Sequence, residues 1–214
     1  MKVNSYSPCD YVMKARDNQP KPLTRYMFET LLDDMNVVFL CDKIREHKPD
    51  AERYKIMLPA ITWQSRFGGK LRTDANAVPS GLFCIDVDIH HEQLFMRALD
   101  EMGTALAYQW AEEEARRRAC KWAAMQKEQD TYGCTPANEL GILAIHISPS
   151  GTGVHVVACC NDLCKSIEEN QKRLACLLET EYDAVCKDWA RIFFVTPRSD
   201  WTYLDMKTLF PEEE

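Results

Sequence analysis

The stretch from Gly81 to His90, with the sequence GLFCIDVDIH, constrains the fold of this chain more than any other. Its apolar run follows a Pro-Ser-Gly turn sequence and predicts a buried β-strand. Asp86 and Asp88 are two residues apart, so a pleated strand places both carboxylates on one face. Because aspartate is disfavoured in strands and crowded carboxylates repel each other, this pair predicts a site for a divalent cation.

Carboxylate oxygens are the ligands that Mg²⁺ and Mn²⁺ prefer, so one of these two ions is the expected cofactor. The competing interpretation is a strand end whose two acids simply face water. An Asp-x-Asp pair alone does not separate the two interpretations.

The composition is that of an ordinary globular protein, with 46% hydrophobic and 28% charged residues among 214. This length predicts a single domain over residues 1–214, with a core of about 55–200 and an N-terminal helical and strand extension over 1–54. The net charge of −7 argues against a protein that coats nucleic acid non-specifically, but it allows a local basic groove.

The sequence contains neither an apolar run long enough for a membrane span nor the apolar segment of a signal peptide. Ten cysteines occur without a CxxC pair and mostly inside apolar runs, which predicts reduced thiols in a cytoplasmic protein. A zinc site from Cys159, Cys160 and Cys164 is disfavoured, because a second ligand pair with suitable spacing is missing.

Apolar spacing predicts helical structure after Thr24, as one long helix or two short ones that end near residues 47–49. A second helix is expected to open with His90, His91 and Glu92. The two histidines could extend a metal site, but the favoured interpretation places them at the exposed start of the helix and outside the core site. Residues 108–132 predict a long, ion-paired helix whose charges face water. A further amphipathic helix is expected over 162–179, capped by Asn161 or Asp162.

The segment 65–72, SRFGGKLR, combines three cations with a Gly-Gly pair, just before the Asp-x-Asp strand. It reads either as a solvated hairpin turn or as a loop that contacts phosphate. In the second interpretation, the three cations Arg66, Lys70 and Arg72 contact phosphate.

Residues 140–159 predict a β-hairpin whose tip is Ser148-Pro149-Ser150-Gly151-Thr152-Gly153. Small residues at the tip leave backbone N–H groups and hydroxyls free to approach a phosphate. His155 follows on the second strand among apolar neighbours. It is either a core histidine or, because of the adjacent tip, a contact for a triphosphate.

Three features therefore follow one another in order: Asp86-x-Asp88 on an apolar strand, the SPSGTGVH hairpin, and Asp183 eight residues before Arg191. This order resembles the archaeo-eukaryotic primase superfamily, the primase-polymerases. Over roughly Lys55 to Asp200 it is similar to the N-terminal domain of VirE-type proteins from bacterial mobile elements, also through the motifs Lys55…Leu58-Pro59-Ala60 and Ser80-Gly81-Leu82.

The resemblance implies an α/β (α+β) fold with a mixed or antiparallel central sheet flanked by helices. It implies that three carboxylates bind metal: Asp86, Asp88 and Asp183. It also implies that nucleotide phosphates contact the hairpin and two basic residues: Ser148, Ser150, Gly151, His155 and Arg191. Asp188 and Asp200 are alternative candidates for the third acid. Asp183 is preferred because it precedes Arg191 by eight residues.

The hairpin departs from the family pattern. Gly153, two residues before His155, stands where the motif has serine, and the turn is one residue shorter.

The implied activity is template-directed nucleotidyl transfer by a DNA primase or polymerase with a two-metal mechanism, during replication of a mobile element. Contacts with the template would then fall to Arg66, Lys70 and Arg72. Its partners would be a single-stranded DNA template, nucleoside triphosphates and a helicase module on the same or another chain. A catalytically silent nucleic-acid-binding or regulatory module and a metal-dependent nuclease remain the alternatives. The residues do not decide between ribo- and deoxynucleotides, or between starting and extending a primer.

Overall fold

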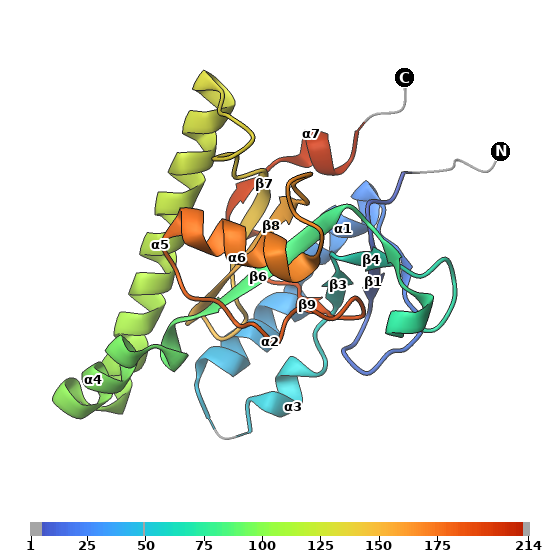
Figure 1. The fold of residues 1–214 in the computed structure, drawn as a ribbon. Coiled ribbons are helices and arrows are strands. Elements are labelled where there is room, and N and C mark those ends of the chain that lie inside the picture. Colours follow the sequence, from blue (N-terminus) through green and yellow to red (C-terminus); the bar gives the residue numbers. More distant parts are fainter. Residues whose placement is uncertain (1–5, 49, 212–214) are drawn as a thin grey trace.

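The computed structural model describes residues 6–48 and 50–211 (Figure 1). Within these residues the chain is a mixed α+β fold with three antiparallel sheets. The predicted mixed class and antiparallel central sheet are therefore confirmed.

The central sheet contains four strands in the order β10-β7-β8-β6. They are β6 (Leu82–Asp88), β7 (Ile142–Ile147), β8 (Gly153–Cys159) and β10 (Trp201–Leu204). β7 and β8 form the predicted hairpin, and β8 pairs with β6 along its whole length. This register sets Asp86 opposite His155 and Asp88 opposite Gly153.

Three helices cover one face of the central sheet: α4 (Gln93–Met102), α5 (Thr104–Tyr132) and α6 (Ile167–Leu178) (Figure 1). On β6, alternate residues Phe83, Ile85 and Val87 point into this core. The long helix α5 packs through alanines at every fourth position, which share one face of a helix: Ala107, Ala111, Ala115 and Ala119. The small side chains allow the helix to lie close to the sheet.

The N-terminal layer covers the opposite face of the central sheet. It contains α1 (Arg25–Leu32), α2 (Met35–Arg45), α3 (Glu52–Lys55) and a second sheet of order β2-β1-β3-β9. The strands of that sheet are β1 (Asp10–Val12), β2 (Lys21–Pro22), β3 (Ala60–Thr62) and β9 (Phe193–Phe194). Leu82 and Cys84 of β6 belong to this second core, so the face of β6 that carries Asp86 and Asp88 is turned toward the N-terminal layer.

The remaining short elements are β4 (Ser65–Arg66), β5 (Val78–Pro79) and α7 (Met206–Leu209), with 3₁₀ turns at Asp74–Asn76, Ile89–His91 and Arg198–Asp200. β4 and β5 pair only with each other, and Gly68 and Gly69 adopt positive φ in the turn after β4. Gly68 and Gly69 therefore form a turn, in agreement with the interpretation of segment 65–72 as a turn.

The predicted start of the first helix agrees with the structure, whereas the predicted start of α6 does not. The N-terminal helical region is two helices, and the Oγ1 atom of Thr24 caps the first by accepting a hydrogen bond from Met27 N–H at 3.2 Å. The predicted start of α6 at Asn161 or Asp162 is wrong. The helix begins after Ser166, whose hydroxyl accepts from Glu169 N–H at 3.1 Å, while Asn161 accepts from Leu163 N–H in a local turn.

All ten cysteines are free thiols, as expected. Among the residues that the structure describes, no helix is both long and apolar enough to cross a membrane.

Candidate metal and phosphate site

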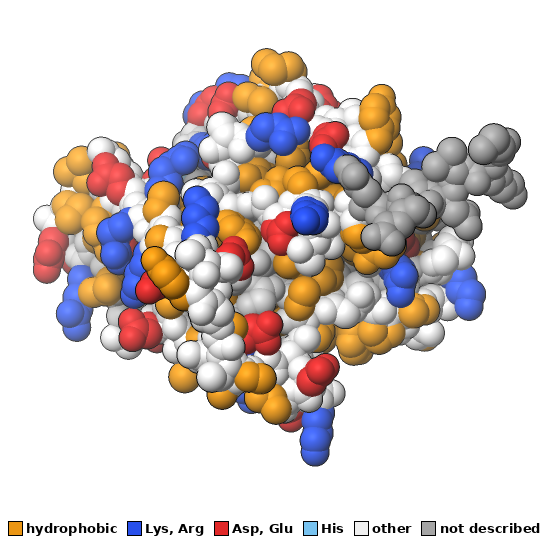
Figure 2. Space-filling view, turned by 90° about the horizontal axis from the view of Figure 1, so that it is seen from above, with side chains coloured by type: hydrophobic (Ala, Val, Ile, Leu, Met, Phe, Trp, Pro, Cys, Tyr) orange, Lys and Arg blue, Asp and Glu red, His pale blue; other side chains and the backbone are white. Residues whose placement is uncertain are grey.

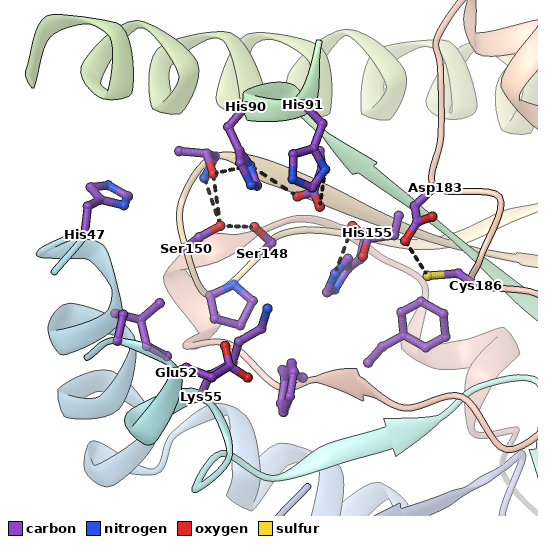
Figure 3. Close-up of a pocket in the computed structure, with 18 of the residues that line it drawn as sticks. His47, Glu52, Lys55, His90, His91, Ser148, Ser150, His155, Asp183 and Cys186 are labelled. Carbon is purple, nitrogen blue, oxygen red and sulfur yellow. Dashed lines mark hydrogen bonds and ion pairs between the residues drawn. The ribbon is translucent and has the colours of Figure 1, made fainter. Parts of the chain in front are cut away.

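A cavity of about 540 Å³ lies between the central sheet and the N-terminal layer. The predicted site residues that line it come from β6, the hairpin and the segment before β9: Asp86, Asp88, Ser148, Ser150, His155, Asp183 and Arg191. Figure 3 shows Glu52 and Lys55 on the side of the cavity opposite His90 and His91. The cavity therefore gathers segments that lie far apart along the chain, from Ile44 to Phe194.

Asp86 carries a carboxylate into the cavity from the middle of the sheet. Its Oδ1 atom is buried without a hydrogen-bond partner and lies 3.4 Å from Nε2 of His155. Burial opposes ionisation of Asp86, but the positive charge of His155, with Lys55 and Arg191 farther away, holds the pKa of Asp86 below its ordinary value of 3.8. An ionised, buried oxygen without a partner suits a cation ligand.

Asp183 is held beside Asp86 by the backbone. Its N–H donates to the carbonyl oxygen of Asp86 at 2.8 Å, and its Oδ1 atom accepts from Val185 N–H at 2.9 Å. The Cys186 thiol donates to Asp183 Oδ2 at 3.5 Å. One ligand atom each from Asp86, Asp183 and Cys186 lies within 4.8 Å of the others.

Asp88 belongs to a different group of ligand atoms, with His90 and His91. Burial, followed by the negative charge of Asp86, raises the pKa of Asp88 to about 6. Burial, followed by the neighbouring His91, lowers the pKa of His90 to about 4. Both histidines lie in the turn just before α4, as expected for a helix start, and they are also neighbours of Asp88.

The three predicted acids thus line one cavity but divide between two groups of ligand atoms. A smaller cavity of about 120 Å³ lies between the groups and is lined by both Asp88 and Asp183. Asp86 and Asp183 together offer the oxygen ligands that suit Mg²⁺ or Mn²⁺, and Asp88 offers another within the same cavity. The residues present fit a divalent ion.

The hairpin tip presents hydroxyl groups to the cavity. Ser148 Oγ lies 3.0 Å from Ser150 Oγ, which lies 3.1 Å from Thr152 Oγ1. Gly151 has φ +82°, a conformation that favours glycine, and its N–H donates to Ser148 O at 2.9 Å.

Gly153 allows the close approach of the hairpin to β6. A Cβ atom there would lie 2.8 Å from Asp88 Oδ1 and 3.0 Å from Ser148 Oγ. A serine at position 153 would therefore collide with Asp88 and Ser148.

Three basic side chains surround the acids. His155 is buried, and its Nδ1 atom lacks a hydrogen-bond partner. The Nη2 atom of Arg191 donates to Val185 O at 2.8 Å and pairs with Asp188 at 3.2 Å. Lys55, from α3, lies across the cavity, and its charge helps to lower the pKa of Asp86.

Lys55 was not among the predicted site residues. Its place in the motif Lys55…Leu58-Pro59-Ala60 was the only sequence signal for it.

The other two candidates for the third acid are engaged elsewhere. Asp188 pairs with Arg191, as described above. Asp200 is buried against Arg45, whose Nη2 atom donates to its Oδ2 at 2.6 Å, with Arg116 at 3.6 Å. Only Asp183 of the three lines the main cavity.

The predicted template residues Arg66, Lys70 and Arg72 lie outside the main cavity. Arg72 donates to the carbonyl oxygens of Ala190 at 2.9 Å and Ala15 at 3.0 Å, and it lines a neighbouring groove of about 320 Å³. Arg72 therefore has a structural role, because it joins the segments of Ala15 and Ala190. Figure 2 shows basic and acidic side chains interspersed on the face seen from above.

Comparison with models of known protein families, with curated proteins and with solved structures finds no match to this chain.

Proposed function

We propose that this protein is a metal-dependent nucleotidyl transferase of the primase-polymerase type, which joins nucleotides on a single-stranded DNA template. The observation that carries the proposal is the common cavity of Asp86, Asp88 and Asp183 with the hydroxyl-lined hairpin and three basic side chains. Acids for cations and bases for phosphates in one cavity are the two requirements of this reaction.

Bound Mg²⁺ or Mn²⁺ would stabilise the attacking 3′-hydroxyl oxygen and the leaving pyrophosphate. Asp86 and Asp183 would hold this ion, with Asp88 beside them. His155, Arg191 and Lys55 would bind the triphosphate, because charge-assisted hydrogen bonds to phosphate are strong. The hydroxyls of Ser148 and Ser150 would orient the phosphates from the hairpin side.

In the proposed setting, the chain makes or extends a primer during replication of a mobile element, together with a helicase module. The second candidate is a metal-dependent nuclease, because the same acids could activate water against a phosphodiester. The third is a silent binding module that keeps the fold. The basic side chains around the acids favour a triphosphate and hence the first candidate.

The test is nucleotide incorporation on single-stranded and primed DNA with Mg²⁺ or Mn²⁺, using both ribo- and deoxynucleotides. Asp86→Asn and Asp183→Asn should each lower incorporation by about 100-fold or more, as expected when transition-state stabilisation of roughly 3 kcal/mol is removed. Asp162→Asn, on an exposed turn outside the cavity, is the matched control and should retain full activity.

Degradation of DNA without incorporation would replace the proposal by the nuclease. Binding of template without either reaction, in wild type and with both ions, would replace it by the silent module. Incorporation that survives Asp183→Asn but not Asp86→Asn would remove Asp183 from the ligand set.

A further inference from the structure

Asp88 also forms a second cluster of metal-ligand atoms with His90 and His91, two histidines that the proposed reaction does not use. Nδ1 of His90 lies 3.7 Å from Asp88 Oδ1, and Nδ1 of His91 lies 3.6 Å from Asp88 Oδ2. Each imidazole thus faces a different oxygen of one carboxylate. One ligand atom from each residue lies within 4.8 Å of the other two.

The backbone after β6 produces this cluster. Ile89 is fully buried, and its N–H donates to Thr152 O at 3.0 Å, which ties the turn to the hairpin. The 3₁₀ turn Ile89–His91 then brings both histidine rings beside Asp88, with ring centroids 4.1 Å apart. Figure 3 shows the two rings side by side above the hairpin.

Contacts around His90 hold its ring in place. Its Nδ1 atom lies 3.2 Å from Thr152 Oγ1, at the end of the hydroxyl chain from Ser148 and Ser150, and its ring packs edge-on against Phe95. The same Nδ1 atom faces Asp88, so an ion bound there would take the place of the contact with Thr152. Asp88, His90 and His91 all line the main cavity, so an ion can reach them from solvent.

We propose that Asp88, His90 and His91 bind a transition-metal ion, such as Mn²⁺, Co²⁺ or Zn²⁺, in preference to Mg²⁺. Imidazole nitrogen suits transition metals, whereas Mg²⁺ prefers oxygen ligands and keeps several waters. The cavity therefore contains two chemically different positions. One is rich in carboxylate oxygen at Asp86 and Asp183, and the other combines one carboxylate with two imidazoles.

This inference depends on the side-chain geometry and does not require that the chain transfers nucleotides. A protein that never incorporates a nucleotide would still bind the ion here. Failure of the incorporation assay and failure of this inference are therefore separate results.

The experiment loads the full chain with Mn²⁺ and uses pulsed EPR, which detects ¹⁴N nuclei of imidazoles bound to the ion. Wild type should show ¹⁴N coupling that persists in a hundredfold excess of Mg²⁺. His90→Gln and His91→Gln should each weaken Mn²⁺ binding by roughly tenfold or more, and the double variant should lose the coupling. Circular dichroism verifies that each variant is folded.

His47→Gln is the matched control, because His47 also lines the cavity but lies outside the cluster. It should retain both the affinity and the coupling. Absence of ¹⁴N coupling in wild type would overturn the proposal. Coupling that survives the double variant and disappears in His155→Gln would also overturn it, since the ion would then be bound at Asp86.

Discussion

At the scale of single residues, His146 places a titratable ring inside the protein. Its side chain is 1% exposed, stacks on Trp201 with ring centroids 4.2 Å apart, and has Nδ1 3.0 Å from Thr196 Oγ1. Burial, with a smaller contribution from the neighbouring His155, holds the pKa of His146 well below its ordinary value of 6.5. The folded protein therefore keeps this imidazole neutral.

Because the pKa of His146 is lower in the folded state, the unfolded state binds more protons in mildly acidic solution. The contribution of His146 to stability is complete above pH 6.5 and is lost as the pH falls below it. We expect His146→Phe to flatten the decrease in unfolding free energy between pH 7.5 and 5, measured by urea denaturation. Leu163→Ala, which removes an exposed side chain without a titratable group, should leave the slope close to that of wild type. An unchanged slope in His146→Phe would contradict the assignment.

At the scale of elements, α6 connects the strand that carries Asp86 with the loop that carries Asp183. Gln171 is fully buried, and its Nε2 atom donates to Cys84 O on β6 and to Cys186 O, both at 2.9 Å. Cys186 lies in the turn that begins at Asp183. One side chain thus fixes the distance between the strand of Asp86 and the loop of Asp183.

We expect Gln171→Leu to lower the unfolding free energy by about 1–3 kcal/mol, because two carbonyl oxygens lose a buried donor. It should also weaken Mn²⁺ binding, since the loop of Asp183 is released from β6. Chemical denaturation and metal titration measure the two effects. Lys172→Ala, on the exposed face of the same helix, should change the unfolding free energy by only about 0.5 kcal/mol. Full Mn²⁺ affinity in Gln171→Leu would show that the loop does not need this connection.

At the scale of the whole molecule, the cavity lies between two layers that have separate hydrophobic cores. The acids come from the side of the central sheet, whereas Lys55 comes from the N-terminal layer. A nucleotide bound with metal would contact both layers and would stabilise the folded state by mass action.

We expect Mn²⁺ with a nucleoside triphosphate to raise the Tm by roughly 5–10 °C at about 100 times Kd. Lys55→Ala should keep the shift produced by Mn²⁺ alone and lose most of the additional shift from the nucleotide. Lys70→Ala, an exposed residue outside the main cavity, should behave as wild type. Differential scanning fluorimetry measures both shifts. An unaltered nucleotide shift in Lys55→Ala would exclude this lysine from phosphate binding.

Several features of this protein were determined by the sequence alone. The apolar run around Asp86 and Asp88 predicted the strand and the shared face of its acids, because side-chain alternation is a local property of strands. The serine- and glycine-rich tip predicted the hairpin, because these residues favour tight turns whatever packs around them. Thr24 predicted a helix cap. The end of α6 nearest Asn161 was misplaced, because several nearby residues are equally good caps and local propensity does not choose among them.

Tertiary structure decided which of these residues meet. Asp183 was one of three possible acids until the chain placed its N–H on the carbonyl of Asp86 and buried Asp200 against Arg45, 155 positions away. Lys55 and the ring positions of His90 and His91 likewise depend on how the N-terminal layer and the hairpin pack on the central sheet. Spacing along the chain reports what one element can present, whereas distances between elements arise only when apolar faces are buried together.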